Sequence, residues 1–243
     1  MRRFAYLLAN NDGLPGIKKD MEDYRSFLMG CSGGAWDPGE IVSRYNISLA
    51  TLQVDLSAIR AEHYDYVVFY YSGHGDWKRE TRLYINEKDE CIAEGSVVGL
   101  APRQLSIFDC CRVSSSSATK GLTEVFDEAI TNDSVRRNWA RSKFDNLVMG
   151  VPAQEVRLYA CKLNQCAFAT ENGSLYTQAL LSVASAESRS SDITAVKVHD
   201  ASCPIVSVKA SVLGETQCPD RTTNGSDSRS LPFAIRPPQI LFG

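Results

Sequence analysis

The sequence has no hydrophobic run long enough to cross a membrane and no excess of basic charge. A membrane-spanning helix needs about 20 consecutive apolar residues. The first apolar segment, Arg3–Ala9, is much shorter and ends at the polar residues 10–12. The net charge is -3, so no overall basic field attracts nucleic acid. We therefore expect no membrane or nucleic-acid partner, a cytoplasmic location, and a buried first strand at Arg3–Ala9.

Metal ligands are also scarce. The chain has three histidines and no Cys-x-x-Cys pair, and the spacing of Cys161 and Cys166 suits zinc poorly. We expect no metal site and no cofactor. The cysteines number eight, but the chain is long and we find no export signal, so we expect reduced thiols rather than a disulfide framework.

Length and composition are those of a globular protein. The 243 residues are 44% hydrophobic and 23% charged, and a chain of this length can bury a substantial core. No internal repeat is visible. We expect a single domain over residues 1–243.

Predicted strands and helices alternate through the first half of the chain. Tyr64–Tyr71 is rich in β-branched and aromatic residues, as in a strand buried on both faces. Lys18–Met29 has apolar residues at helical spacing. This alternation predicts an α/β fold with a mostly parallel sheet covered by helices. The other predicted elements are strands at Arg3–Ala9, Glu40–Tyr45, Leu105–Asp109, Val156–Ala160 and Leu231–Arg236, helices at Ser48–Ala61 and Gly173–Ala184, a hairpin from Arg82–Ile85 towards Cys91, and a loop at Thr216–Ser230.

Two segments with reactive side chains follow neighbouring predicted strands, Ser72–Gly75 and Asp109–Arg112. In parallel sheets the working residues lie at the carboxyl ends of strands, which are about 5 Å apart. His74 can therefore act as the base for a Cys111 nucleophile, and the N–H groups of Gly75 and Cys111 can stabilise an oxyanion. From these residues alone the alternative stays open, because a buried cysteine is usually a small hydrophobe and a histidine beside glycines can be a turn residue.

Several motifs, in order along the chain, resemble the caspase family, especially metacaspases and bacterial caspase-like proteins. Tyr70–Gly75 resembles the family's histidine motif, and Ile107–Arg112 resembles its nucleophile motif. Ala5–Asp20 is similar to the opening strand and helix, and Leu158–Cys161 and Gly173–Leu181 are similar to the small-subunit segment. The resemblance covers most of the chain. It implies a caspase-like three-layer α/β/α sandwich and a cysteine endopeptidase with protein substrates.

The resemblance also implies which cysteine reacts. The family's nucleophile lies two positions after an acid or glutamine, which selects Cys111 after Asp109 and makes Cys110 a buried apolar neighbour. Cys111 lies 37 positions after His74, fewer than the ~50 quoted for caspases. The shortening falls in Asp76–Arg103, where loop length can vary without moving the strands.

The resemblance to metacaspases further implies that Asp20, Ser72 and Asp109 line the first specificity pocket. Two carboxylates there favour a guanidinium or ammonium group, so we expect cleavage after Arg or Lys. Three alternatives stay open. Asp20 can be a solvated acid in a first helical turn. The enzyme can instead prefer aspartate, or the chain can be a catalytically silent interaction module.

Regulation is less visible in the sequence. By resemblance, residues 1–112 correspond to a large subunit, 113–150 to a basic linker and 151–243 to a small subunit. Leu122–Phe144 is either a solvated charged helix or a linker cut after Lys120, Arg137, Arg141 or Lys143.

The acids of Asp76–Glu94 do not reproduce the calcium-binding cluster of many metacaspases, so calcium activation is not expected. A bare catalytic unit would need self-cleavage or an activating or regulatory protein partner. Bacterial relatives imply a role in bacterial defence or regulated cell death.

Overall fold

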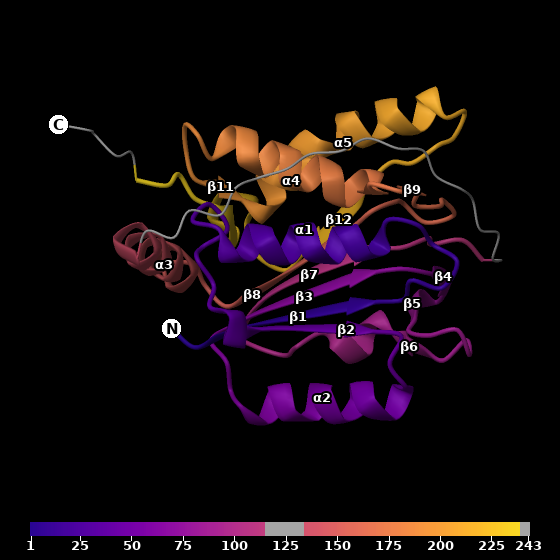
Figure 1. Cartoon of the computed structure of the whole chain (residues 1–243), viewed down its shortest axis with the longest axis horizontal. Coiled ribbons are helices and arrows are strands. Elements are labelled where there is room, and N and C mark those ends of the chain that lie inside the picture. Colours follow the sequence, from indigo (N-terminus) through magenta and orange to yellow (C-terminus); the bar gives the residue numbers. More distant parts are fainter. Residues whose placement is uncertain (115–133, 239–243) are drawn as a thin grey trace.

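The fold is built on a six-stranded, mostly parallel sheet (Figure 1). The computed structural model describes residues 1–114 and 134–238. The strand order is β12-β8-β7-β3-β1-β2, and only β12 runs antiparallel to its neighbour. The strands are β1 (Arg3–Ala9), β2 (Ile41–Tyr45), β3 (Tyr66–Ser72), β7 (Arg103–Asp109), β8 (Gln154–Tyr159) and β12 (Asp220–Thr223).

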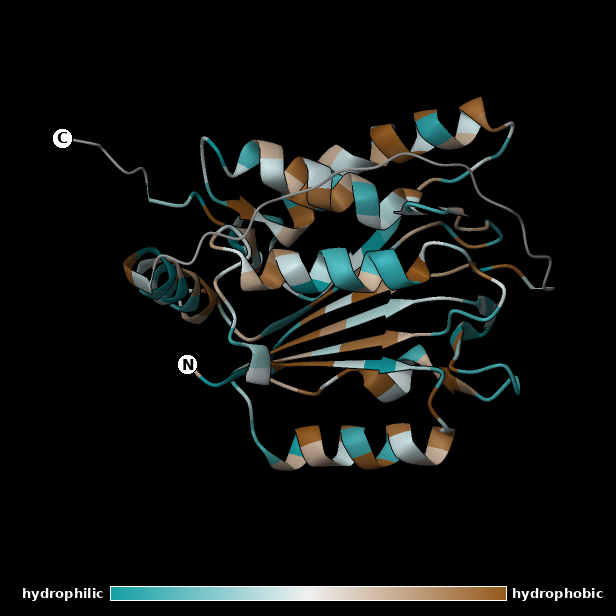
Figure 2. Ribbon diagram, viewed as in Figure 1, coloured by the Kyte–Doolittle hydropathy of each residue, from teal (hydrophilic) through white to brown (hydrophobic). Residues whose placement is uncertain are grey.

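The centre of the sheet is buried on both faces because its strands are apolar at nearly every position. All seven residues of β3 are buried. Tyr66, Val68 and Tyr70 face one apolar cluster, and the alternate residues 67, 69 and 71 face another. Figure 2 shows apolar residues running along these inner strands. The period of two in a strand therefore divides the core into two layers, one on each side of the sheet.

Helices cover both faces, which confirms the three-layer sandwich (Figure 1). The helices α1, α4 and α5 pack on one face and α2 packs on the other. Ser48 caps α2, since its side chain accepts a hydrogen bond from Thr51 N at 3.1 Å. The helices are α1 (Ile17–Met29), α2 (Leu49–Ala61), α3 (Ser134–Met149), α4 (Leu175–Glu187) and α5 (Ala195–Val212). None of the helices in the described ranges is both long and apolar enough to span a bilayer.

Smaller sheets lie outside the central one. The predicted hairpin is present. It is part of a three-stranded sheet, because a further strand precedes it, and this first strand begins directly after His74. Two two-stranded sheets lie in the second half of the chain. The strands are β4 (Gly75–Lys78), β5 (Glu80–Tyr84) and β6 (Cys91–Ala93), then β9 (Ala169–Thr170) with β10 (Gly173–Ser174), and β11 (Ile193–Thr194) with β13 (Pro232–Ala234); short 3-10 helices span Pro38–Glu40, Glu94–Val97 and Asp227–Arg229.

The C-terminal third differs most from the sequence prediction. The predicted loop Thr216–Ser230 contains β12, which extends the central sheet beside β8. The residues of β12 are polar, so its sequence does not show the alternation of apolar residues that predicts a strand. The strand is recognised only by its backbone pairing with β8. The predicted last strand is shorter than expected, and β13 pairs with β11 rather than with the central sheet. The helix α5, which contains Pro204, was not predicted.

The described part of the basic segment Leu122–Phe144 forms a charged helix. A charged helix was one of the two interpretations of its sequence. In α3, Arg141 pairs with Glu40 and with Asp37, at 3.0 Å from the Asp37 carboxylate, and Arg137 donates to Met29 O at 2.6 Å. The proposed cut sites after Arg137, Arg141 and Lys143 therefore lie in a docked helix, which would have to unwind to enter a protease. The proposed site after Lys120 lies outside the described residues.

Candidate active site

The candidate residues lie at the carboxyl ends of two neighbouring central strands. Ser72 at the end of β3 is the register partner of Asp109 at the end of β7. His74 and Cys111 each follow this pair by two positions. The two loops stay together beyond the strands, since Gly73 N donates to Asp109 O at 3.1 Å. The parallel register therefore brings His74 and Cys111 to the same edge of the sheet.

Glycine allows the histidine loop to contact the cysteine loop directly. A Cβ atom on Gly75 would lie 2.6 Å from Cys110 Sγ and 2.9 Å from Cys111 O. Gly73 has φ 154° and leaves similarly little room, because a Cβ there would lie 2.8 Å from Asn10 O. Such distances exclude any larger residue without movement of the loops. The backbone beside His74 thus packs against the loop that carries Cys111.

His74 is held by a backbone carbonyl. Its Nε2 lies 2.7 Å from Asp12 O. A carbonyl oxygen only accepts, so Nε2 carries the proton and Nδ1 of the neutral ring is left as the acceptor. The His74 carbonyl accepts from Tyr71 Oη at 2.6 Å and from Tyr84 N at 3.0 Å, which fixes the loop. From the sequence, Asp12 was noted only among the polar residues 10–12 that end the first apolar segment.

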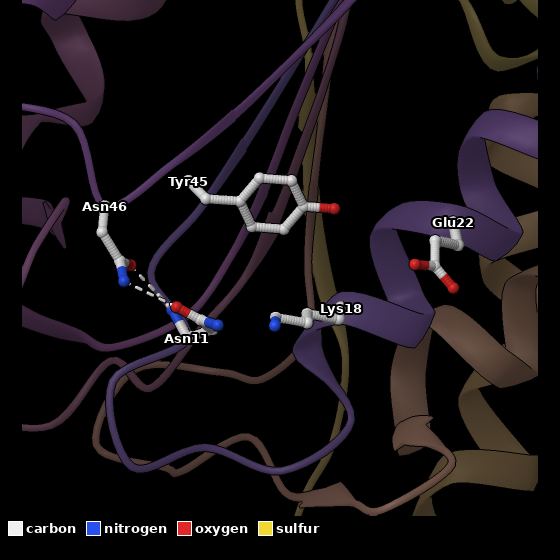
Figure 3. A pocket seen from close by; sticks show the side chains of 5 residues that line it. All are labelled: Asn11, Lys18, Glu22, Tyr45 and Asn46. Carbon is white, nitrogen blue, oxygen red and sulfur yellow. Dashed lines mark hydrogen bonds between the residues drawn. The ribbon is translucent and has the colours of Figure 1, made fainter.

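The loop that carries Asp12 is braced from β2. Asn11 N donates to Asn46 Oδ1 at 3.1 Å, and Asn46 Nδ2 donates to Asn11 Oδ1 at 2.6 Å. The two asparagines border an open hollow of about 480 Å³ beside α1 (Figure 3). Its other lining residues are Lys18, Glu22 and Tyr45. The pairing links the end of β2 to Asn11, the neighbour of the residue whose carbonyl contacts the imidazole.

The Cys111 thiol is half-buried and interacts with a second cysteine that the sequence analysis weighed only as a zinc ligand. Its Sγ lies 3.7 Å from Ala167 O. Interaction with the Cys166 thiol raises the pKa of Cys111, with burial adding to the effect, and the same interaction lowers the pKa of Cys166 to about 7. No hydrogen bond joins His74 to Cys111 among the described residues. The Cys111 thiol is therefore protonated in this arrangement.

Two backbone N–H groups beside Cys111 have no partner within the described chain. Tyr84 N donates to His74 O, which makes Gly75 and Leu83 a non-hydrogen-bonded pair of the β4–β5 ladder. The Gly75 N–H is therefore outside that ladder. The N–H of Cys111 likewise donates to no described carbonyl. The two groups predicted to form an oxyanion hole are thus left without an internal acceptor in the described chain.

The residues flanking Cys111 are structural. Cys110 is buried in an apolar cluster and burial raises the pKa of its thiol, which confirms its interpretation as a packing residue. Arg112 is also buried, with its guanidinium 3.9 Å from the centre of the Tyr159 ring. Its Nε donates to Thr81 Oγ1 at 3.2 Å. These contacts fix the backbone on both sides of the thiol.

The three predicted specificity residues come together below this edge. Asp20, Ser72 and Asp109 are buried, and Ser72 Oγ donates to Asp20 Oδ2 at 3.4 Å. Ser174, the N-cap of α4, joins the two acids: its N–H lies 3.0 Å from Asp20 Oδ1, and its hydroxyl donates to Asp109. Thr177 Oγ1 also donates to Asp109, at 2.7 Å. Asp20 is therefore not a solvated helix residue.

The partners of these acids were not predicted from the sequence. Ser174 and Thr177 fell inside the predicted helix Gly173–Ala184, whereas the helix begins at Leu175. A serine just before an apolar helical run is an N-cap signal, and it could have marked Ser174.

The two carboxyl groups are difficult to ionise together. Burial, followed by the nearby Asp109 charge, raises the pKa of Asp20 well above its usual value. Burial likewise raises the pKa of Asp109. Among the described residues, no Lys or Arg forms an ion pair with either group. The site therefore lacks a cation that would make two buried carboxylates favourable.

The acids of Asp76–Glu94 take part in local structure. Asp76 pairs with Arg82, and Glu80 accepts from Gly95 N at 3.0 Å. Glu90 accepts from Leu49 N at 3.2 Å. In the described ranges, no group of three or more His, Cys, Asp and Glu side chains is placed to hold a metal ion.

The layered sheet and its strand order define a caspase-like α/β/α sandwich. The family model described as the caspase domain matches residues 2–224, and the chain therefore belongs to this family of cysteine endopeptidases. The structure is similar to that of caspase-1 from Spodoptera frugiperda, with a TM-score of 0.58 and 12% sequence identity over 91% of this chain and 86% of that one. That likeness concerns the fold alone. No curated protein matches the chain in sequence.

Proposed function

We propose that the chain cleaves peptide bonds with Cys111 as nucleophile and His74 as general base. The observation that carries this proposal is the register of β3 and β7, which sets both loops at one sheet edge with Gly75 packed against the Cys111 backbone. The Asp12 carbonyl supports the role of His74, because it holds the proton on Nε2 and leaves Nδ1 to accept.

The proposed reaction proceeds through an acyl-enzyme. Nδ1 of His74 takes the proton of the Cys111 thiol, and the thiolate attacks the scissile carbonyl. The N–H groups of Gly75 and Cys111 stabilise the resulting oxyanion. The imidazolium then protonates the leaving amine, and water, activated by the same base, hydrolyses the thioester. Hydrogen bonds between such groups often tighten only when substrate binds.

We propose that Asp20, Ser72 and Asp109 select Arg or Lys at the cleaved bond. The site holds two buried carboxylates and, in the described chain, no cation paired to them. A guanidinium or ammonium group would restore the balance of charge, whereas a substrate aspartate would add a third acid. The charge of the site therefore favours basic over acidic residues at the cleaved bond.

Activation is proposed to involve the strand β10. A Cβ atom on Gly173 would lie 2.2 Å from Asp20 Oδ1, so β10 lies directly on the acids. A substrate side chain must exchange with the Ser174 contacts to reach them. Self-cleavage between the large-subunit-like residues 1–112 and the small-subunit-like residues 151–243, or an activating protein partner, would shift this strand.

Fluorogenic peptides test the proposal. Substrates that differ only in Arg, Lys or Asp at the cleaved bond are compared with the wild-type chain, Cys111→Ala and the matched control Cys31→Ala. We expect turnover of Arg and Lys substrates that Cys111→Ala abolishes and Cys31→Ala retains. Preference for Asp would contradict the specificity. Binding of partner proteins without turnover of any peptide would favour the catalytically silent module.

A further inference from the structure

The second thiol beside Cys111 belongs to a loop whose path runs antiparallel to the nucleophile loop. Arg112 N donates to Gln165 O at 2.9 Å, and Asn164 N donates to Arg112 O at 2.8 Å. One residue back, Cys111 Sγ reaches Ala167 O at 3.7 Å. Residue 112 thus contacts residues 164–165, and the preceding residue, 111, contacts residue 167. Moving backward along one loop corresponds to moving forward along the other, as in antiparallel chains. Cys166 therefore lies opposite Cys111.

This arrangement suits a covalent link between the two sulfur atoms. Residues that face each other across antiparallel backbones have Cα atoms about 4.5–5.5 Å apart, which falls within the range of about 4.4–6.8 Å found in disulfides. The two thiols influence each other's ionisation, and both are free and only half-buried. Solvent therefore reaches the pair.

We propose that Cys166 is an oxidation site that forms a reversible disulfide with Cys111 when a hydroperoxide reaches the enzyme. The loss of activity that this disulfide would cause rests on the proposed role of Cys111 as nucleophile. The disulfide itself depends only on the geometry of the two loops.

The proposed oxidation has two steps, formation of a sulfenic acid on Cys166 and its condensation with the Cys111 thiol. The thiolate of Cys166 attacks the peroxide, an S–O bond forms, the O–O bond breaks, and hydroxide leaves, or an alkoxide from an organic hydroperoxide. The Cys111 sulfur then attacks the sulfenic sulfur, an S–S bond forms, the S–O bond breaks and water leaves with the thiol proton. Two thiols are oxidised by two electrons and the peroxide is reduced. A dithiol reverses the change by exchange.

Cys166 is the better first target of the two. At neutral pH the thiolate forms more readily on Cys166, because interaction with Cys111 lowers the pKa of Cys166 to about 7 and raises that of Cys111. A sulfenic acid left alone proceeds to sulfinic acid, which dithiols do not reduce. The disulfide would therefore protect the nucleophile from irreversible oxidation.

The test treats the full chain with hydrogen peroxide and maps disulfides by mass spectrometry of a non-reduced digest. Three variants accompany the wild type: Cys166→Ser, Cys111→Ala and, as matched control, Cys31→Ser at the opposite edge of the sheet. In wild type and Cys31→Ser we expect a linked pair of peptides that contain positions 111 and 166. Both should lose peptidase activity and regain it with dithiothreitol. In Cys111→Ala, a dimedone-type probe should trap sulfenic acid at Cys166.

Cys166→Ser should form no such link, and its Cys111 should reach the sulfinic state with activity that dithiothreitol does not restore. The absence of the linked peptides in wild type, or equal recovery of activity in Cys166→Ser, would overturn the proposal. If the link forms but Cys111→Ala still cleaves peptides, the disulfide stands and the proposed catalytic role fails. The two proposals are thus tested separately.

Discussion

The substitution Asp20→Asn isolates the charge of the proposed specificity site. Asparagine has the shape of aspartate and keeps an oxygen that can accept from Ser174 N, now 3.0 Å from the carboxylate. The substitution therefore removes the group that would become a carboxylate beside a bound cation, while leaving the packing of α1 against β10 in place. We expect weaker recognition of an Arg side chain and an intact fold.

The size of the effect follows from the contact that is lost. A hydrogen bond to a charged group contributes about 1.5–3 kcal/mol, so kcat/KM for an Arg substrate should fall roughly 10- to 150-fold. Unlike the activity, the stability of the fold should improve in the variant at high pH. Because burial raises the pKa of Asp20 in the folded state, the stability of the wild type declines as pH rises through that pKa. The variant lacks this group and should decline less.

The assay compares two peptides that differ only in Arg or its neutral analogue citrulline at the cleaved bond. Asp20→Asn should lose activity on the Arg peptide and keep its activity on the citrulline peptide. Asp23→Asn is the matched control, since Asp23 lies one turn further along α1 and pairs with Lys19 at 2.9 Å. Equal losses on both peptides, or an unchanged ratio of their rates, would refute the reasoning. Urea unfolding at several pH values checks the stability.

Three further predictions concern other parts of the molecule. In Gly75→Ala, the added methyl would lie 2.6 Å from Cys110 Sγ, so the loops must separate and kcat should fall roughly 100-fold or more; wild-type kcat in a folded variant would contradict this. Asn46→Ala removes two hydrogen bonds to Asn11, each contributing about 1 kcal/mol, and should lower kcat up to roughly 30-fold, with partial rescue in Asn46→Asp. Burial lowers the pKa of His199 to about 4 from the usual ~6.5, so stability that is present at neutral pH is lost as pH falls through this range. At pH 5 the loss should be about 2 kcal/mol in urea unfolding and absent in His199→Gln, and equal pH profiles of the two proteins would disprove it.

The central fold was predictable because its strands and the helices between them carry strong local signals. The β-branched and aromatic run in β3 and the serine cap of α2 led to bounds within two residues of those observed. The order of the motifs at His74 and Cys111 led to the family, which the family model confirms. In these segments the spacing of apolar residues reflects burial on one or both faces of the element. This spacing can be recognised in a single sequence.

The C-terminal strands were less predictable because their stability comes from partners distant in sequence. The polar strand β12 exists through its pairing with β8, about 60 positions earlier. The helix α5 carries a proline that breaks its pattern, although Val206 and Ala210 still pack in the core. Contacts of this kind leave no periodic trace in the local sequence.

The sequence by itself determined the layered α/β class, the family and which residues could react. It identified Asp20, Ser72 and Asp109 as companions only through resemblance. Tertiary structure alone decided that Ser174 joins the two acids, that the Asp12 carbonyl orients His74, and that Cys166 lies against the Cys111 thiol. The reason is physical: each of these contacts joins residues more than 50 positions apart, so it depends on how the strands stack side by side rather than on any local preference of the chain.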